Sequence, residues 1–276
     1  MIRFFRYQGS KEHIVNIVRN LSLINSNYKI YIEPFLGSGT VFINIPDVFD
    51  QYIVNDIDEN VISIWKAILE YSYGDYRATD LIIKDKFGDI KESKESYYKF
   101  RDYYNEFYHF TNAPEKGLFL YFLANSCINS MLRFGPNGMN QSFGNRLFIM
   151  KENEYNIIKH KLSKAKIFNT DYQNIIRGRQ NSVIYLDPPY FQRHTSYTEN
   201  FNEDNLIKLI ELISYLHHSN NIFYSDIETK ISDKLLNLNF TKITAKEMRN
   251  ISPLRNQEFI DKNEVLYHNI KNRFFI

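Results

Sequence analysis

The sequence predicts an α/β fold with an open, mostly parallel sheet that a helical segment interrupts. Two observations predict it. Near both ends of the chain, short runs rich in β-branched and aromatic residues alternate with stretches of helical periodicity. From about residue 63 to residue 150 the pattern is helical and very aromatic, with no evident buried strand. We therefore expect one discontinuous α/β domain, residues 1–62 and 151–276, with residues 63–150 inserted as a helical domain.

Two βα units in sequence begin the predicted sheet. Residues 28–32 alternate toward a short strand, and the glycine turn Gly37-Ser38-Gly39 leads from it into an apolar run that we expect to be helical. A second strand is predicted at residues 51–55. It is followed at residues 59–71 by apolar residues at helical spacing.

The βα rhythm returns after residue 165. Strands are expected over five further runs: 166–168, 182–186, 221–224, 240–245 and 264–268. A helix is predicted at residues 205–217, and a polar loop that contains Arg249 is expected to join the last two strands.

Composition limits the class of protein. With 276 residues, 43% of them hydrophobic, the chain can bury a core, which excludes a disordered tail. The net charge is only +2, so any nucleic-acid binding must use local patches. The single cysteine, Cys127, excludes an intrachain disulfide and a cysteine-based zinc cluster, and no run approaches the ~18 apolar residues of a membrane span. We expect a cytoplasmic protein without a membrane segment or a metal.

The glycine turn and the acid after the second strand predict a nucleoside ligand. Gly37 and Gly39 follow the first strand, where ligands of open sheets bind and where glycine lets the backbone approach them. Asp56 closes the next strand, and a carboxylate there can accept hydrogen bonds from ribose hydroxyls. Phe42 stands where the dinucleotide fingerprint has its third glycine, which disfavours NAD. The alternative is a tight strand-to-helix connection with Asp56 capping the helix.

The tetrapeptide Asp187-Pro188-Pro189-Tyr190 follows a predicted strand and carries the chemistry. Two prolines cannot continue a sheet and supply no N–H donors, so the loop presents carbonyls beside the Asp187 carboxylate. An acceptor-only loop suits an amino group. If Asp187 and the Pro188 carbonyl accept both N–H bonds of a nucleobase amine, attack by its lone pair is favoured, and Tyr190 can stack on the base. The alternative is a rigid turn with a satisfied aspartate and a packed tyrosine.

With these motifs in order, the chain resembles the DNA adenine-N6 methyltransferases of the Dam family over nearly its whole length. Arg6-Tyr7-Gln8-Gly9-Ser10-Lys11 is similar to the family's N-terminal segment, although Ser10 replaces a glycine. Residues 33–42, 55–58 and 168–172 resemble its cofactor loop, its ribose-binding segment and the element that holds the cofactor's adenine. The resemblance implies a Rossmann-like S-adenosylmethionine-dependent methyltransferase sheet.

The resemblance also implies which residues bind S-adenosylmethionine. They are Tyr7, Lys11, Glu33, Phe35, Gly37, Gly39, Asp56, Asp171, Tyr172 and Asp187. In the family the aromatic residue and the lysine of the N-terminal segment contact the cofactor, and Asp171 is the match for the residue that binds its amino group. The alternative for Lys11 is a surface charge that caps a helix.

The predicted insert resembles the family's target-recognition stretch between residues 129 and 146. The family's Gly-x-Phe-Asn is Gly138-Met139-Asn140 here. DNA contacts are implied for Asn129, Met131, Arg133, Asn140, Arg146, Arg193 and Tyr197. Arg133 can hydrogen-bond a guanine in the major groove, or alternatively lie over a helix. Arg193 is a candidate phosphate contact or a solvated loop charge, and Tyr197 belongs to the loop after the tetrapeptide.

The sequence therefore predicts a site-specific DNA adenine-N6 methyltransferase that acts on a flipped-out adenine in double-stranded DNA. Asp187, Pro188, Pro189 and Tyr190 are the predicted catalytic residues. The resemblance makes GATC the first candidate target, a restriction endonuclease a candidate partner and a monomer the expected state. The alternatives are methylation of cytosine N4 or of an RNA base, and a catalytically idle DNA-binding regulator of the same fold.

Overall fold

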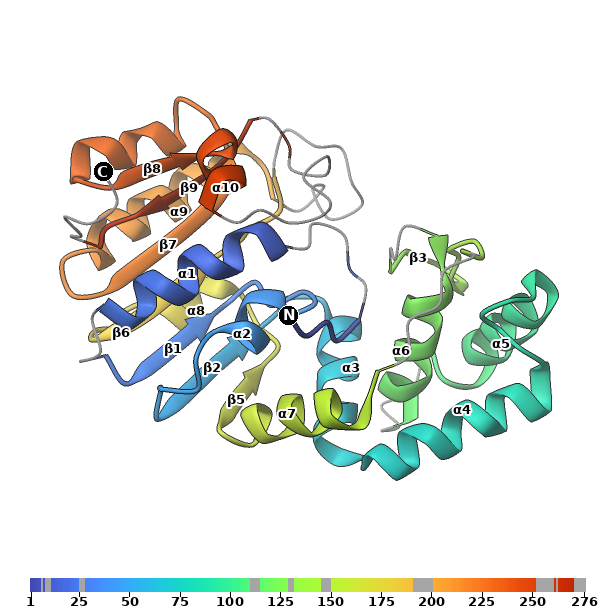
Figure 1. Cartoon of the computed structure of the whole chain (residues 1–276). Helices are drawn as coiled ribbons and strands as arrows, with labels where there is room; N and C mark the ends of the chain where they lie inside the picture. The colour runs from blue at the N-terminus through green and yellow to red at the C-terminus, as the bar shows by residue number, and fades with distance from the viewer. Residues whose placement is uncertain are drawn as a thin grey trace. The chain divides into compact units, whose positions relative to one another are not determined.

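A computed structural model describes residues 1–5, 7, 11–24, 28–109, 115–128, 132–144, 150–190, 201–251, 261 and 263–270. The fold is α/β, as predicted. In the described residues a seven-stranded sheet has the order β5-β2-β1-β6-β7-β9-β8 (Figure 1). Its strands are β1 (Ile30–Glu33), β2 (Gln51–Asn55), β5 (Ala165–Phe168), β6 (Ser182–Leu186), β7 (Asn221–Ile227), β8 (Thr241–Thr244) and β9 (Glu264–His268).

The pairing of the strands decides which strand ends meet. β1 pairs in parallel with β2 and β6, and β6 pairs in parallel with β7. β9 runs antiparallel to both β7 and β8. The carboxyl ends of β1, β2, β6 and β7 therefore lie at one edge of the sheet, and the first residue of β9 joins them there.

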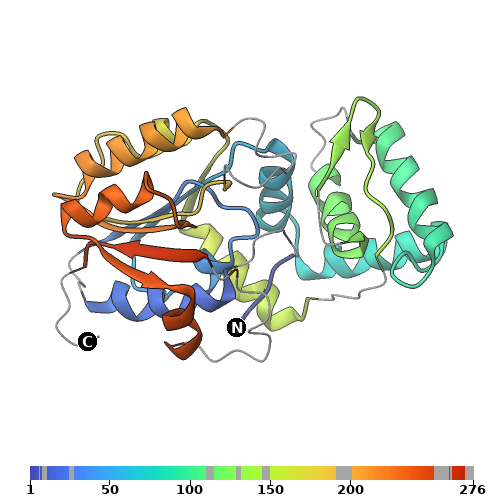
Figure 2. The same ribbon diagram turned by 90° about the horizontal axis from the view of Figure 1, so that it is seen from above.

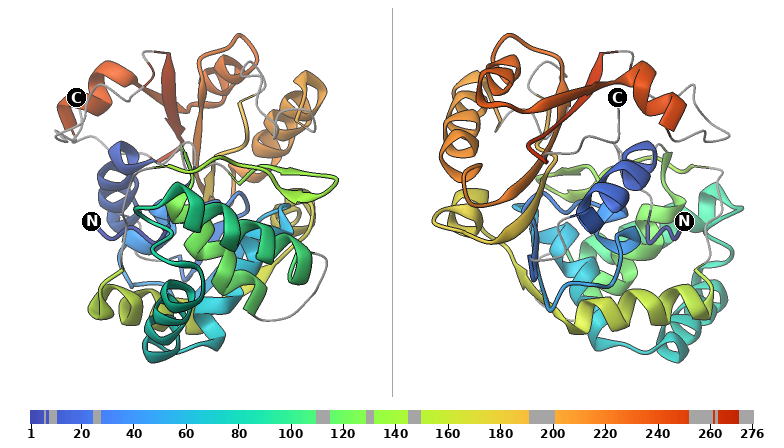
Figure 3. Two further views of the ribbon diagram at one scale, coloured as in Figure 1. Left: turned by 90° about the vertical axis from the view of Figure 1, so that its right-hand side faces the viewer. Right: turned by 60° about the vertical axis from the view of Figure 1, so that its left-hand side comes forward.

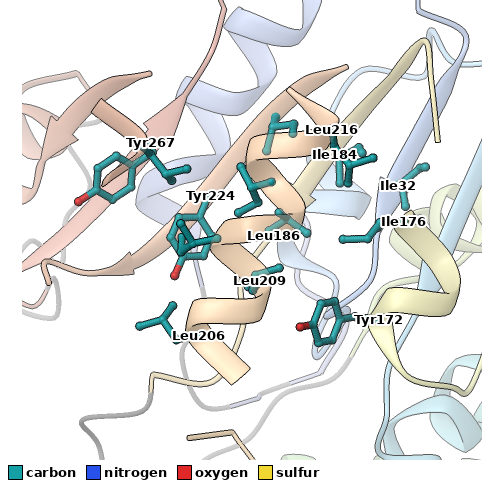
Figure 4. Close-up of a cluster of buried hydrophobic side chains, with 14 of the residues drawn as sticks. Ile32, Tyr172, Ile176, Ile184, Leu186, Leu206, Leu209, Leu216, Tyr224 and Tyr267 are labelled. Carbon is teal, nitrogen blue, oxygen red and sulfur yellow. The ribbon is translucent and has the colours of Figure 1, made fainter. Parts of the chain in front are cut away.

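One face of this sheet packs against the helices α8 (Tyr172–Ile176) and α9 (Glu203–Leu216). Strand residues that point to this face, among them Ile184 and Tyr224, are fully buried there (Figure 4). Helix α9 contributes Leu206, Leu209 and Leu216, which recur at helical spacing on its buried side. Alternation along the strands and the helical period of α9 thus build one apolar layer.

The opposite face is covered by α1 (Glu12–Ile24) and α10 (Ala245–Ile251), and Figure 2 shows the strands between α9 and α1. The carbonyl of Lys11 accepts the N–H groups of Ile14 and Val15, so Lys11 lies at the start of α1. The predicted loop around Arg249 is wrong, because Arg249 lies in α10. Thr244 and Glu247 exchange side-chain-to-backbone hydrogen bonds and cap that helix.

By packing, the chain divides into two compact units. One comprises residues 11–36, 44–57 and 170–276, and the other residues 1–10, 37–43 and 58–169. The functional division predicted at residues 63 and 150 stays a prediction. In the described residues, no helix is long and apolar enough to cross a membrane.

The second unit is mainly helical (Figure 3, left). Its helices are α2 (Thr40–Asn44, of which Asn44 falls in the first unit), α3 (Glu59–Glu70), α4 (Tyr73–Phe87), α5 (Lys94–Phe107), α6 (Glu115–Ser126) and α7 (Glu152–Ser163). The hairpin of β3 (Phe134–Gly135) and β4 (Gly138–Met139) was not predicted, since two-residue strands leave no periodic signal.

Aromatic rings and one glycine hold this unit together. The rings of Tyr76 and Phe122 stack with centroids 5.2 Å apart. A Cβ on Gly117 of α6 would lie 1.9 Å from the Ser63 carbonyl oxygen of α3, so only glycine permits this close helix packing. Cys127, which follows α6, is buried, and its thiol donates to the Ala124 carbonyl at 3.4 Å.

Candidate active site

Residues from two separate sequence motifs meet at the carboxyl end of β6. The Lys11 Nζ lies 3.2 Å from Asp187 Oδ1 and 4.8 Å from the centroid of the Tyr190 ring. Lys11 is 6% exposed, so this ammonium is not a surface charge. A fourth residue completes the cluster, because Glu264 Oε1 lies 3.5 Å from the same Nζ.

Glu264 reaches this cluster through the direction of β9. Its register partner on β7 is Ile227, so the start of β9 lies beside the end of β7. Glu264 Oε1 accepts a hydrogen bond from the Tyr190 hydroxyl at 2.9 Å, and Glu264 Oε2 lies 3.1 Å from His13 Nε2. Sequence reasoning missed Glu264 and His13, since the sheet order places Glu264 near Tyr190 and the packing of helix α1 places His13 near Glu264.

The buried Lys11 ammonium, which lies near both Asp187 and Glu264, is central to the electrostatics of the cluster. Burial raises the pKa of Asp187 to about 6, with Lys11 opposing and Glu264 adding to the rise. Burial also favours a neutral Glu264, but Lys11 and His13 outweigh it and bring the pKa of Glu264 down to about 2. Burial lowers the pKa of Lys11, yet the two carboxylates hold it above its usual value. At neutral pH Lys11 therefore stands between two ionised carboxylates.

Two further ionisable groups flank Asp187. The Tyr185 hydroxyl is buried with no hydrogen-bond partner in the described part of the chain, and burial together with the Asp187 charge raises its pKa. On β7, Asp226 accepts hydrogen bonds from the Tyr224 hydroxyl at 2.6 Å and from the Ile227 N–H at 2.7 Å. Burial nevertheless raises the pKa of Asp226 to about 7.

Asn55, the last residue of β2, ties together the loops that carry predicted cofactor residues. Its Nδ2 donates to the carbonyls of Pro34 (2.9 Å) and Thr170 (3.0 Å), and its Oδ1 accepts the Thr170 N–H at 3.0 Å. These loops precede Phe35 and Asp171. The role of Asn55 follows from the order β2-β1 of the sheet, which the sequence alone does not reveal.

The predicted cofactor residues of this unit surround the loops that Asn55 holds. The rings of Phe35 and Tyr172 lie 5.1 Å apart, and Asp171 caps α8 by accepting the Gln173 N–H at 2.8 Å. Glu33 is buried at the end of β1 and accepts the Tyr31 hydroxyl at 2.6 Å.

The glycine turn has the backbone that the sequence predicts. Gly37 and Gly39 have φ of +47° and +60°, the left-handed region that favours glycine. A Cβ on Gly37 would lie 3.0 Å from the Tyr7 ring, so Tyr7 closes over the turn. The alternative role for Asp56 as a helix cap is wrong, because Asp58 caps α3 by accepting the Asn60 N–H at 2.9 Å.

Two of the predicted DNA-binding residues flank the β3–β4 hairpin, Arg133 before β3 and Asn140 after β4. Arg133 and Asn140 are exposed, and the Arg133 Nε donates to Asn140 Oδ1 at 2.7 Å. From α5, the Asn105 side chain exchanges two hydrogen bonds with the Met139 backbone, at 2.9 and 2.8 Å. A Cβ on Gly138 would lie 2.5 Å from Asn105 Oδ1, which requires glycine there. Asn129, Met131, Arg146, Arg193 and Tyr197 lie outside the described residues.

Comparisons with known proteins agree on one family. Residues 7–251 match the family described as D12 class N6 adenine-specific DNA methyltransferase. The chain is 28% identical to the type II methyltransferase M.MjaIII of Methanocaldococcus jannaschii over 272 residues, which cover 90% of this chain and 92% of that protein. It is 27% identical to the DNA adenine methylase of Haemophilus influenzae over 200 residues, 71% of this chain and 66% of that protein.

Among solved structures, the rRNA methyltransferase aviRa from Streptomyces viridochromogenes aligns with a TM-score of 0.44 and 12% identity. The alignment covers 95% of this chain and 85% of that one.

Proposed function

Because the chain belongs to the D12 class N6 adenine-specific DNA methyltransferase family, we propose that Asp187-Pro188-Pro189-Tyr190 binds the adenine that this enzyme methylates. Methylation of adenine N6 in DNA is the reaction of the family. One observation supports the assignment of the loop: the partly buried Asp187 carboxylate at the end of β6 pairs with the buried Lys11 ammonium, next to the partly buried Tyr190 ring. Ion pairs with a buried partner and a shifted pKa at the ends of sheet strands are typical of functional sites.

The loop acts through hydrogen-bond acceptors. Asp187 and the Pro188 carbonyl accept the two N–H bonds of the target amine, which turns its lone pair away from the ring and toward the methyl donor. The amine gives up one proton after transfer, and an ionised Asp187 is the base beside it. Since the pKa of Asp187 is about 6, the carboxylate is ionised at neutral pH. Tyr190 provides a face for base stacking.

We propose that S-adenosylmethionine is the methyl donor. The residues fit it: the glycine turn has a left-handed backbone with the Tyr7 ring next to Gly37, and the rings of Phe35 and Tyr172 pair beside the Asn55 loops. Bound S-adenosylmethionine supplies an electrophilic methyl group. The residues that would hold it are Tyr7, Lys11, Glu33, Phe35, Gly37, Gly39, Asp56, Asp171, Tyr172 and Asp187.

We propose double-stranded DNA as the substrate and residues 63–150 as the target-recognition domain. N6 is inside the duplex, so the adenine must leave the stack before it meets Asp187. Arg133 supports this role. Its Nε donates to Asn140 Oδ1, so its two terminal nitrogens can donate to the O6 and N7 atoms of a guanine. By family likeness, Asn129, Met131, Arg146, Arg193 and Tyr197 are further DNA contacts.

We further propose that the target sequence is GATC and that a cognate restriction endonuclease is a partner. We also propose that the protein is a monomer and acts in the cytoplasm. The resemblance of the sequence to the Dam family makes GATC the first target to test. The type II names of other relatives support a restriction partner.

The test is to incubate the pure protein with unmethylated genomic DNA and labelled S-adenosylmethionine. Modified adenines are then mapped by single-molecule sequencing, and their chemistry is checked by nucleoside mass spectrometry. N6-methyladenine at one short motif, absent with Asp187→Asn, would support the assignment. A product on cytosine or RNA, or full activity of Asp187→Asn, would overturn it. Calorimetry with S-adenosylmethionine tests the cofactor separately.

A further inference from the structure

We propose that Glu264 is a positioning residue for methyl transfer: its carboxylate anchors Tyr190 and gives Lys11 a second anionic partner, so that Asp187 is free to accept the target amine. The inference deepens the proposed function and rests on it. Neither the tetrapeptide nor the cofactor motifs contain Glu264, which follows Asp187 by 77 positions in the chain.

The first step of the argument is the anchor on Tyr190. The Tyr190 hydroxyl donates to Glu264 Oε1 at 2.9 Å and lies 3.3 Å from Ser225 Oγ. Since Glu264 is ionised, its bond to the hydroxyl is charge-assisted and stronger than a neutral one. The tyrosine follows two prolines that cannot pair with neighbouring strands, so the anchor at its far end fixes the ring that is to stack on the base.

The second step is the sharing of Lys11. Its ammonium is buried and lies 3.2 Å from Asp187 Oδ1 and 3.5 Å from Glu264 Oε1. A buried ammonium that loses its only anionic partner is strongly disfavoured. Because Glu264 remains, Asp187 can turn its oxygens to the amine without leaving Lys11 unpaired.

The third step is the orientation of the carboxylate itself. His13 lies 3.1 Å from Glu264 Oε2, while Oε1 faces Tyr190 and Lys11. The hydrogen bond and ion pair at Oε1 and the close contact of His13 at Oε2 together restrict rotation of the carboxylate. The ionisable groups that act on Asp187 come from all elements around it: Lys11 and His13 at the start of α1, Tyr185 on β6, Tyr190 after it, Asp226 on β7 and Glu264 on β9.

The test compares Glu264→Gln with wild type in substrate-free protein carrying ¹³C-labelled aspartate. Glutamine keeps an acceptor for Tyr190 but removes the negative charge that raises the pKa of Asp187. The Asp187 carboxyl should then titrate roughly half a unit to one unit lower. Asp233→Asn is the matched control, because Asp233 also pairs a tyrosine hydroxyl (Tyr267, 2.7 Å) with a lysine (Lys242, 2.8 Å). An unchanged Asp187 titration in a folded Glu264→Gln protein overturns the proposal, whether or not the protein methylates DNA.

Kinetics test the anchor. In methyl-transfer assays Glu264→Gln should lower kcat about tenfold, with a small change in the KM for S-adenosylmethionine. Glu264→Ala should lower kcat further than Glu264→Gln, because alanine has no acceptor for the Tyr190 hydroxyl and glutamine keeps one. Tyr190→Phe removes the hydroxyl, so the losses of Glu264→Ala and Tyr190→Phe should combine to less than their product. If the fold-loss of the double variant equals the product of the two single fold-losses, the anchor is contradicted. An inactive wild type with the expected Asp187 titration would contradict only the proposed function.

Discussion

The Asn55 side chain and the Thr170 backbone exchange two hydrogen bonds, Nδ2 to the carbonyl and N–H to Oδ1, each 3.0 Å long. Asn55→Asp keeps the acceptor and turns the donor into a carboxylate oxygen that faces the Pro34 and Thr170 carbonyls. We expect a loss of about 2–4 kcal/mol in the free energy of unfolding and weaker cofactor binding. Urea unfolding and calorimetry measure both. Asn174→Asp, an exposed amide on the Thr170 hydroxyl, is the control.

Acid should inactivate the enzyme through Asp187. Only its ionised form accepts both N–H bonds, and the pKa of the free enzyme's carboxyl is about 6. The value of kcat/KM should therefore fall about tenfold per unit as the pH decreases below about 6. Cofactor and DNA binding measured at each pH separate this effect from weaker binding. A flat profile between pH 5 and 7 would exclude Asp187 as the titrating base.

Asp226 should make the protein less stable as the pH rises. Burial raises its folded-state pKa from 3.8 to about 7, so the folded state binds more protons than the unfolded state between these values. Stability then falls with increasing pH across that window. Asp226→Asn should flatten this part of the stability curve, as measured by urea unfolding between about pH 4 and 7. Asp233→Asn is the opposite case, because hydrogen bonds from Lys242 and Tyr267 outweigh burial and lower the pKa of Asp233.

Alanine variants of Gly37 and Gly178 should distinguish the effect of backbone strain from that of side-chain crowding. Gly37 and Gly178 both have positive φ, but a Cβ meets the Tyr7 ring only at Gly37 and nothing within 4 Å at Gly178. Each alanine variant should lose about 1 kcal/mol of stability from backbone strain. Gly37→Ala alone should also weaken S-adenosylmethionine binding, by roughly tenfold. Equal cofactor affinities of the two variants in calorimetry would remove Gly37 from the binding site.

The hairpin should depend on α5 for its DNA contacts. Asn105→Ala removes both hydrogen bonds to Met139 and should raise the Kd for target DNA about tenfold, with S-adenosylmethionine binding unchanged. Ser93→Ala is the control, since Ser93 caps the other end of α5 and its loss should cost only about 1 kcal/mol of stability. Fluorescence anisotropy with a labelled duplex measures the difference. If both variants bind DNA alike, the hairpin is not held for recognition by Asn105.

Much of the fold could be predicted because the strands carry strong local signals. The predicted bounds of β2, β6 and β9 are those observed, since each is a short apolar run between polar residues. β7 continues three residues beyond its prediction, to Ile227, because Ser225 and Asp226 are polar yet buried. A buried polar residue in a strand has no periodic signature.

Only those parts of the candidate site that lie in continuous motifs could be predicted from the sequence. Asp187 and Tyr190 stand in one short motif, which a sequence reveals directly. Glu264 joins them because β9 enters the sheet antiparallel beside β7, and His13 reaches Glu264 from helix α1. No local sequence pattern encodes either neighbour. Asn55 was seen only as part of the predicted ribose segment, whereas its amide proves to be a structural tie between loops.

Because Cys127 is buried, a cysteine introduced on the surface can be labelled selectively. It is the only cysteine, 4% exposed, and its thiol is bonded to the Ala124 carbonyl. Maleimide dyes will therefore react first at a cysteine introduced on the surface. Asn137→Cys, at the exposed tip of the β3–β4 hairpin, would carry such a dye without removal of the native thiol. Single-molecule fluorescence could then follow the hairpin as it meets a DNA duplex.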